Sequence, residues 1–278
     1  MHVLPRTRRG CRLSHISLPT LAALAVIVAM PLDARGCEGL LAGPRGVVTS
    51  VTDGDTLLLD NGLVVRLIGI QAPKLPLGRE GFPTWPKADE AKAALEKMTQ
   101  GKQVEVRYGG ERMDRYGRTL GQLFVIGSSE TWVQQQMVAK GMARVYSFPD
   151  NRRCVTDLLA AENTARTNKL GIWTDPYYSV RRADRPETIA PLVGHYELIE
   201  GRVLKAERRG RLVYLNFGRD WAEDLTVVID SAAQKLFGST DPVRLEGALV
   251  RVRGWVDERD GPRLEVTHPE QIEVLSTR

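Results

Sequence analysis

The most restrictive feature of this sequence is the stretch from residue 46 to residue 70, which reads GVVTSVTDGDTLLLDNGLVVRLIGI. Short apolar runs rich in Val, Leu and Ile alternate in it with Asp-Gly and Asn-Gly, the pairs that favour tight hairpin turns. This pattern predicts three consecutive antiparallel strands. A chain that contains them must bury one face of a β-meander.

Three helices and two further strands are predicted in the next hundred residues. Helical spacing of apolar residues occurs over 87–100, and in TWVQQQMVAKG and CVTDLLAAENTARTNKLG, each of which ends at a glycine. Strands are predicted in KQVEVRY and in DRYGRTLGQLFVIG. This order predicts a five-stranded OB-fold-like barrel with three helices over residues 37–174, in a chain that is mainly β with α.

A second domain is predicted after a linker. Residues 175–191 lose all periodicity and concentrate proline and charge, which indicates a linker that proteases would reach first. Residues 192–278 then contain five predicted strands, with the short helix SAAQKLFG between the third and the fourth. We expect a second OB-fold-like five-stranded barrel there.

Residues 1–36 are typical of a signal peptide, because several arginines precede the apolar run LPTLAALAVIVAMPL. Its removal would leave no transmembrane span and would place the protein in the periplasm or outside the cell. The run TRRGCRL also resembles a twin-arginine signal, and lipidation at Cys37 is an alternative to ordinary cleavage. In an oxidising compartment, Cys37 and Cys154 would form a disulfide, the alternative being two buried thiols.

The net charge argues against a protein that binds nucleic acid mainly through a large excess of positive charge. The whole chain carries a net charge of +5, but residues 37–278 hold 34 Lys+Arg and 33 Asp+Glu, a net charge of +1. Residues 37–191 have a net charge of +3 and residues 192–278 of −2. Neither half is strongly basic. His195 and His268 are too few and too distant in the sequence for a zinc motif.

Candidate site residues occur near the predicted meander. Asp53 and Asp55 flank Gly54, where turn carboxylates can bind a hard cation such as calcium, or simply form a polar hairpin tip. Arg66 interrupts an apolar strand and therefore needs a partner or a function. Arg118 follows a turn from which it can reach the same place, and two guanidinium groups suit one phosphate.

Five ordered motifs resemble the staphylococcal nuclease (thermonuclease) family over roughly residues 46–174. They are VTDGDT, VRLIGIQAP, DRYGRTLGQLFV, VAKGMARVY and the pattern AR…GIW. The resemblance implies a nuclease that hydrolyses phosphodiesters of DNA or RNA with calcium. It implies that Asp55 is a calcium ligand and that Arg66 and Arg118 are the phosphate-binding arginines of the catalytic site.

The sequence departs from that family at Gln71 and Lys74, where active members carry Asp and Glu. Gln71 offers a neutral carbonyl, and a protonated Lys74 cannot accept a proton from water and would repel calcium. Losing a general base costs roughly 10²- to 10⁴-fold in rate. Rescue would require Glu80, Asp89 or Glu90 from the loop and first helical turn that follow; otherwise these are solvated charges.

The second domain offers one further candidate site. Tyr214, Phe217 and Trp221 lie near Arg219 in YLNFGRDW, so they can stack unpaired bases or fill the core.

Three functions remain open from the sequence. The first is an exported nuclease with weak or altered activity and impaired calcium binding. The second is a non-catalytic module that binds nucleic acid or another anion, and the third is an envelope protein that uses its two barrels for protein contacts.

Overall fold

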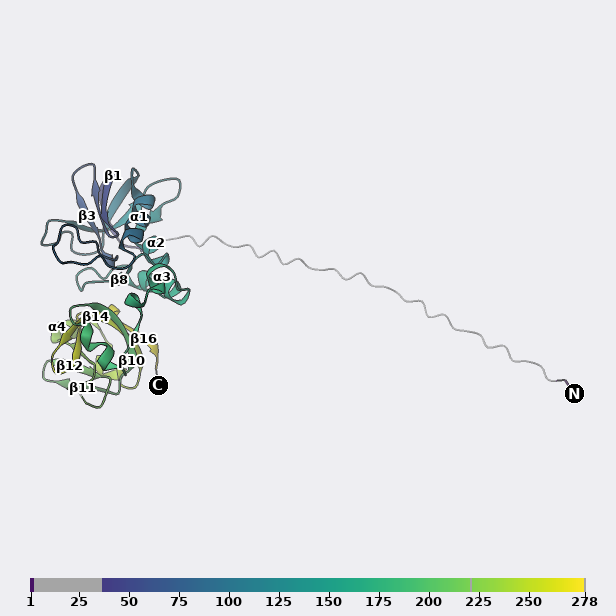
Figure 1. Ribbon diagram of the computed structural model, residues 1–278, viewed down its shortest axis with the longest axis vertical. Helices are drawn as coiled ribbons and strands as arrows, with labels where there is room; N and C mark the ends of the chain where they lie inside the picture. Colours follow the sequence, from purple (N-terminus) through teal and green to yellow (C-terminus); the bar gives the residue numbers. More distant parts are fainter. Residues whose placement is uncertain (3–36, 221, 278) are drawn as a thin grey trace. The chain divides into compact units, whose positions relative to one another are not determined.

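A computed structural model describes residues 1–2, 37–220 and 222–277 of the chain (Figure 1). Almost all of the predicted signal peptide, and also Trp221, lie outside the described residues. In the part that is described, no helix has the length and apolar character that crossing a membrane requires.

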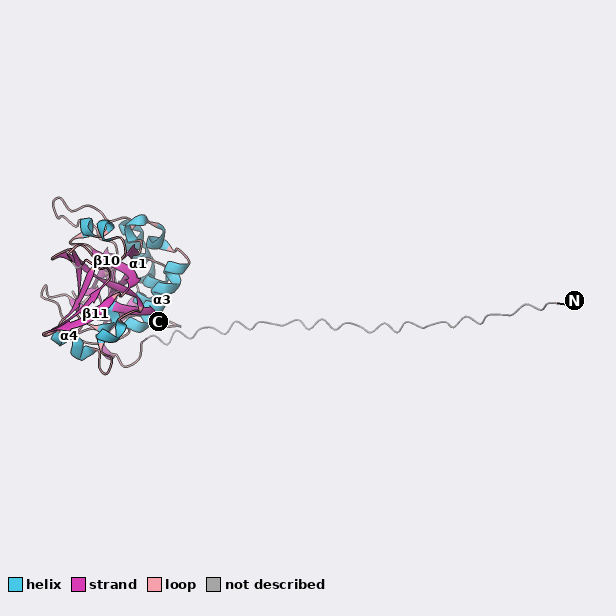
Figure 2. Ribbon diagram, turned by 90° about the horizontal axis from the view of Figure 1, so that it is seen from below, coloured by secondary structure: helices cyan, strands magenta, loops and turns pink. Residues whose placement is uncertain are grey.

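The first half of the chain forms a closed five-stranded barrel with three helices. Helices α1 and α3 are labelled in Figures 1 and 2. Strand β1 pairs with β2 and β5, β6 pairs with β5, and a parallel β3–β6 pairing closes the ring. The elements are β1 (Leu41–Asp53), β2 (Thr56–Leu59), β3 (Val64–Leu67), α1 (Ala88–Thr99), β5 (Gln103–Tyr108), β6 (Thr119–Val125), β7 (Thr131–Trp132), α2 (Val133–Ala139) and α3 (Val155–Thr167). The predicted barrel and its three helices are confirmed.

The meander forms because its apolar residues alternate. Successive side chains in a strand face opposite sides, so Leu57 and Leu59 of β2 and Val65 and Leu67 of β3 all point into the barrel core, at most 1% exposed. The turn between β1 and β2 contains Gly54, which packs against α1 so closely that a Cβ there would lie 2.9 Å from the Ala91 Cβ. The core and the turn therefore hold the site-bearing loop in place.

A second small sheet lies beside the barrel. Strand β4 (Gly69–Gln71) pairs antiparallel with β8 (Arg144–Tyr146). Gly141 after α2 approaches Gly171, the first residue of the 3-10 helix Gly171–Thr174, and a Cβ on either would lie 2.1 Å from the other segment's backbone oxygen. Both glycines also have positive φ values, which suits Gly141 to the end of α2, whereas α3 ends at Thr167, before the expected Gly171.

The second half forms an eight-stranded sheet that curls into a half-barrel, in agreement with the OB-fold-like domain expected there. Its order is β11-β12-β13-β15-β14-β10-β9, and β16 pairs with the first residues of β14, on the same edge as β15. The strands and helix are β9 (Arg181–Arg182), β10 (Tyr196–Arg202), β11 (Lys205–Arg209), β12 (Leu212–Asn216), β13 (Thr226–Ile229), α4 (Ser231–Leu236), β14 (Leu249–Glu258), β15 (Pro262–Val266) and β16 (Ile272–Ser276). The single strand expected in YELIEGRVLKAE is two strands, because β10 pairs with β14 whereas β11 pairs with β12.

Residues 175–191 are more structured than a linker with little to bury. They contain three 3-10 helices (Pro176–Tyr178, Pro186–Thr188 and the start of Ala190–Leu192), and β9 adds in parallel to the edge of β10. Tyr178 and Ile189 are buried, because the apolar residues of this segment pack inward even without a regular period. The domain boundaries stay a prediction.

Buried polar contacts join the barrel to the C-terminal sheet. The Arg253 guanidinium of β14 donates to Glu162 of α3 at 2.7 Å, and both side chains are 0% exposed. Ser147 Oγ lies 2.7 Å from His268 Nε2. Because both contacts exclude water, separating these elements would leave buried charge and polar groups unpaired.

A disulfide ties the residues before β1 to the start of α3. Cys37 and Cys154 are bonded, with Cα atoms 5.0 Å apart and a sequence separation of 117.

Candidate functional site

The tight turn between β1 and β2 carries the central acidic residue of the site. Asp55 is fully buried, and its Oδ2 accepts a 2.8 Å hydrogen bond from the Ala72 amide. The amide of Asp55 in turn donates to Asp53 Oδ1 at 3.0 Å. The turn therefore presents two carboxylates to the same point, as the sequence TDGDT indicates.

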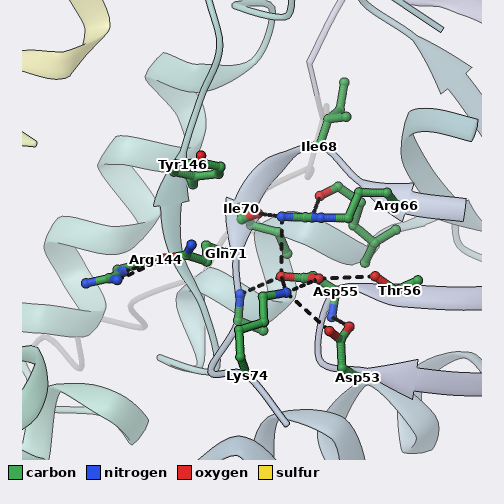
Figure 3. A network of polar contacts seen from close by, with 12 residues as sticks. Asp53, Asp55, Thr56, Arg66, Ile68, Ile70, Gln71, Lys74, Arg144 and Tyr146 are labelled. Carbon is green, nitrogen blue, oxygen red and sulfur yellow. Dashed lines mark hydrogen bonds and ion pairs between the residues drawn. The ribbon is translucent and has the colours of Figure 1, made fainter. Parts of the chain in front are cut away.

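Lys74 places its ammonium group at that point (Figure 3). Its Nζ lies 2.6 and 2.7 Å from the two oxygens of Asp55 and 3.2 Å from Asp53 Oδ2. The Lys74 side chain is 19% exposed, so most of this ion pair is shielded from water. A covalently attached cation thus neutralises the carboxylates from within the protein.

Arg66 reaches the other side of Asp55 from β3. One guanidinium nitrogen lies 3.4 Å from Asp55 Oδ2 and donates to the Ile70 carbonyl at 2.8 Å, while a second donates to the Leu67 carbonyl. These contacts hold the guanidinium in one orientation (Figure 3). Arg66, the charged residue within the apolar strand β3, therefore has both an acidic partner and a fixed orientation.

Gln71 does not face the carboxylates. Its Oε1 accepts hydrogen bonds from Arg144 Nε at 3.1 Å and Nη2 at 2.9 Å, because β4 and β8 place the two residues opposite each other. Arg144 is 4% exposed and also lies under the Tyr196 ring, 4.9 Å from its centroid. Sequence analysis missed Arg144, although an arginine between Ala143 and Val145 carries the same signal as Arg66.

The predicted cations line one open cleft of about 650 Å³. Arg66, Lys74 and Arg118 line it, together with Arg115 and Tyr116. Arg118 is oriented by a 2.7 Å ion pair with Asp114 and keeps 33% of its side chain exposed. The structure therefore brings the two predicted phosphate-binding arginines to one surface, and Arg66 and Lys74 both contact the buried Asp55 beneath it.

The two carboxylates have opposite protonation tendencies. Burial would raise the pKa of Asp55, but the charges of Arg66 and Lys74 outweigh it and hold that pKa well below its usual range. Burial and the neighbouring charge of Asp55 raise the pKa of Asp53, with Lys74 opposing them. At neutral pH Asp55 is therefore ionised and forms ion pairs with Arg66 and Lys74.

The other predicted residues do not join this cleft. Glu80, Asp89 and Glu90 are exposed and none of them lines it, so these three do not replace the missing carboxylates. In the C-terminal sheet, Phe217 is 5% exposed and belongs to the core, which corrects the hypothesis that its ring stacks on bases. Tyr214 lines a separate cleft.

Comparison with known proteins agrees with the barrel and its cleft. The family model described as staphylococcal nuclease homologue matches residues 64–175. The chain is 36% identical to Protein ParB of Escherichia coli over 176 residues, which cover 60% of this chain and 89% of that protein. The chain belongs to the staphylococcal nuclease family. Other members it resembles are an uncharacterized endonuclease of Escherichia coli, 34% identical over 49% of this chain and 81% of that protein, and the thermonuclease of Staphylococcus intermedius, 28% identical over 47% of this chain and 77% of that protein.

Membership of the staphylococcal nuclease family supports a function of the nuclease class, with nucleic acids as substrates. The family is generally calcium-dependent, and calcium prefers six to eight oxygen ligands. Here the residues do not fit that ion. The Lys74 ammonium takes the place between Asp53 and Asp55, and the Gln71 carbonyl is turned to Arg144. Among the described residues, no group of three or more His, Cys, Asp or Glu side chains could hold a metal.

Proposed function

We propose that this protein binds the phosphodiester backbone of DNA or RNA in its barrel cleft and hydrolyses it only weakly by the calcium-dependent route of its family. The observation that carries the proposal is the Lys74 ammonium, 2.6 and 2.7 Å from the two oxygens of Asp55. A lysine in this place excludes a second cation by charge and by volume, while the phosphate-binding arginines stay in the cleft.

Phosphate binding is supported by the arrangement of Arg66 and Arg118. Both guanidinium groups line the same cleft, and each is oriented by contacts within the protein. Planar guanidinium groups bind phosphate oxygens bidentately, and orienting them beforehand reduces the entropy lost on binding. Phosphate binding by these two arginines does not require the family carboxylates that Gln71 and Lys74 replace.

Weak hydrolysis is supported by the lack of a suitable base at the substituted positions. Lys74 is a cation and cannot take a proton from an attacking water, and Gln71 is neutral and already accepts two hydrogen bonds from Arg144. Asp53 and Asp55 both lie against Lys74, and neither lines the cleft. Phosphate charge can therefore be stabilised here more readily than water can be activated.

The test restores the two family carboxylates. The double variant Gln71→Asp with Lys74→Glu should cleave single-stranded DNA in the presence of calcium at least tenfold faster than the wild type, because it gains a metal ligand and a base. Lys74→Glu alone should gain less, because the base would act without a well-held metal. Lys102→Glu, which reverses an exposed charge directly before β5, should change nothing.

The same measurement separates the rival functions. Arg66→Ala in the restored background should abolish the gain, since the phosphate loses its oriented partner. If the wild type already cleaves as fast as the double variant, the proposal of a disabled metal site is wrong. If neither cleaves but the wild type binds oligonucleotides in an Arg66-dependent way, the protein is a binding module. If the protein neither cleaves nor binds oligonucleotides, the third function, an envelope protein that acts through protein contacts, is favoured.

Export to the periplasm or the medium is part of this proposal. It is supported by the Cys37–Cys154 disulfide, which persists in oxidising compartments, and by the signal-like residues 1–36. Fractionation of cells should recover a mature form that begins near residue 37. A full-length form confined to the cytosol would contradict export.

A further inference from the structure

The C-terminal half-barrel has a cleft of its own, about 730 Å³ in volume, on the face of the sheet that points away from its core. Strand alternation creates this face. On β12, Val213 and Leu215 point into the core, whereas Tyr214 and Asn216 line the cleft (strands β11 and β12 are labelled in Figure 1). The cleft is thus a continuous surface across β11, β12, β13 and β15.

Positive charge is concentrated in this cleft. Its lining contains five cations and two carboxylates, an excess of three positive charges, although residues 192–278 as a whole have a net charge of −2. The cations are Lys205, Arg209, Arg219, Arg259 and Arg263, and the carboxylates are Glu207 and Asp260. The negative charge of this half of the chain therefore lies elsewhere on its surface.

Three of the five cations lack an acidic partner. Lys205 and Arg209 both pair with Glu207, at 2.8 and 2.7 Å. Within the described part of the chain, no carboxylate forms an ion pair with Arg219, Arg259 or Arg263. The Nε of Arg263 is also buried and has no hydrogen-bond partner among the described residues.

The arrangement of these groups selects the ligand. The cations come from β11, from the loop after β12, from the turn between β14 and β15, and from β15 itself, so they are spread along the cleft rather than gathered around one anion. Tyr214 lies among them with the apolar side chains of Leu212 and Val228. Separated cations around an aromatic ring match a chain of phosphates that carries bases. The ring can stack only on a base that is not already paired in a duplex.

We propose that this cleft binds single-stranded nucleic acid, with Tyr214 stacking on a base and Arg219, Arg259 and Arg263 neutralising phosphates. The inference goes beyond the proposed function because it concerns the C-terminal sheet and does not require hydrolysis. It would give the protein a second contact with the polymer whose backbone the barrel cleft binds.

The experiment measures binding of the full chain to fluorescently labelled oligothymidylate by anisotropy, over a range of salt concentrations and without divalent ions. All variants are made in the Arg66→Ala background, so that barrel binding is weakened equally throughout. The double variant Arg219→Glu with Arg259→Glu should bind at least tenfold more weakly. It should also reduce the slope of log affinity against log salt by about 1.4, as expected for two lost phosphate contacts on a single strand.

Two matched variants distinguish the cleft from general charge and from misfolding. Arg244→Glu reverses an exposed arginine of the same half-barrel that does not line the cleft, and it should bind like its parent. Tyr214→Ala should weaken binding about tenfold, whereas Tyr214→Phe should keep it, because the stacking ring remains. Oligouridylate in parallel shows whether the cleft prefers RNA or DNA.

Three outcomes would overturn the proposal. One is an equal effect of Arg244→Glu and of the cleft double variant. Another is equal affinity for a duplex of the same length, since a paired base cannot stack on Tyr214. The third is binding of polyglutamate but of neither oligonucleotide, which would make the cleft a site for an acidic protein segment.

Discussion

At the scale of single residues, Lys74 changes the chemistry of the site more than any other side chain. A lysine is a point charge on a flexible stem, so it can satisfy Asp53 and Asp55 at 3.2 and 2.6 Å without the ordered ligand shell that a metal needs. It is also permanent, whereas a bound metal can exchange. The site has therefore kept its charge balance while losing an open coordination position.

Lys74→Met should destabilise the protein at neutral pH by about 2 to 3 kcal/mol. The change removes the ammonium but keeps a stem of similar length, so Asp55 stays buried with Arg66 as its remaining cation. Urea denaturation of this variant and of Lys102→Met, an exposed control, measures the effect. An unchanged midpoint for Lys74→Met would show that the ion pair contributes nothing to stability.

The stability that the Asp55–Lys74 ion pair contributes decreases as the pH falls. The pKa of Asp55 is lowered in the folded state, so its contribution to stability is present above the usual carboxyl pKa of about 4 and is lost as the pH falls below it. The raised pKa of Asp53 works in the opposite direction. The difference in stability between the wild type and Lys74→Met should shrink below pH 4, because a protonated Asp55 no longer needs its cation.

At the scale of elements, the disulfide joins two segments that strand pairing alone does not connect. Cys37 lies four residues before β1, and Cys154 directly precedes α3. The bond therefore fastens the start of the barrel to the helix that also carries Glu162.

The double variant Cys37→Ser with Cys154→Ser should lose about 4 to 5 kcal/mol of stability, because a closed loop of this length restricts the unfolded chain. Reductant should destabilise the wild type and leave the double variant unchanged. Titration of two free thiols in the unfolded, unreduced wild-type protein would contradict the bond.

At the scale of the whole molecule, the barrel and the C-terminal sheet share polar contacts, two of them buried and one partly buried. Ser147 meets His268, Glu162 meets Arg253, and Arg152 pairs with Glu270 at 2.7 Å. Because these pairs are lost together if the elements separate, the stability of each half depends on the other.

His268 should make the whole protein sensitive to mild acid. Burial lowers its pKa to about 4, with Glu270 opposing and Arg152 adding to the shift. The unfolded chain, with a histidine pKa of about 6.5, binds more protons between these values, so stability falls as the pH drops through this window. The full loss is roughly 3 kcal/mol.

Denaturation midpoints at pH 7, 5.5 and 4.5 measure this effect. His268→Gln should remove the part of the pH dependence that belongs to this window, and His195→Gln, an exposed control, should keep it. Identical pH profiles for the wild type and His268→Gln would show that protonation of His268 is not linked to folding.

The sequence by itself determined the local elements of the barrel and the identity of the site residues. The alternation around Leu57 and Val65 and the turn glycines act over a few residues, so the strands could be predicted without knowledge of distant partners. The motifs around Asp55, Arg66 and Arg118 likewise indicated the family before any geometry was known. Lys74 could be recognised as a misplaced cation because its neighbours belong to one of these motifs.

Only the tertiary structure decided where those side chains point and which of them meet. Gln71 faces Arg144 from 73 residues away, and nothing local to either residue indicates that pairing. Phe217 is a core residue, and the cations of the second cleft lie on one face of the C-terminal sheet, although residues 192–278 carry a net charge of −2. The physical reason is range: turns and strand alternation follow from neighbouring residues, whereas ion pairing and charge segregation depend on contacts that form only when distant strands pair.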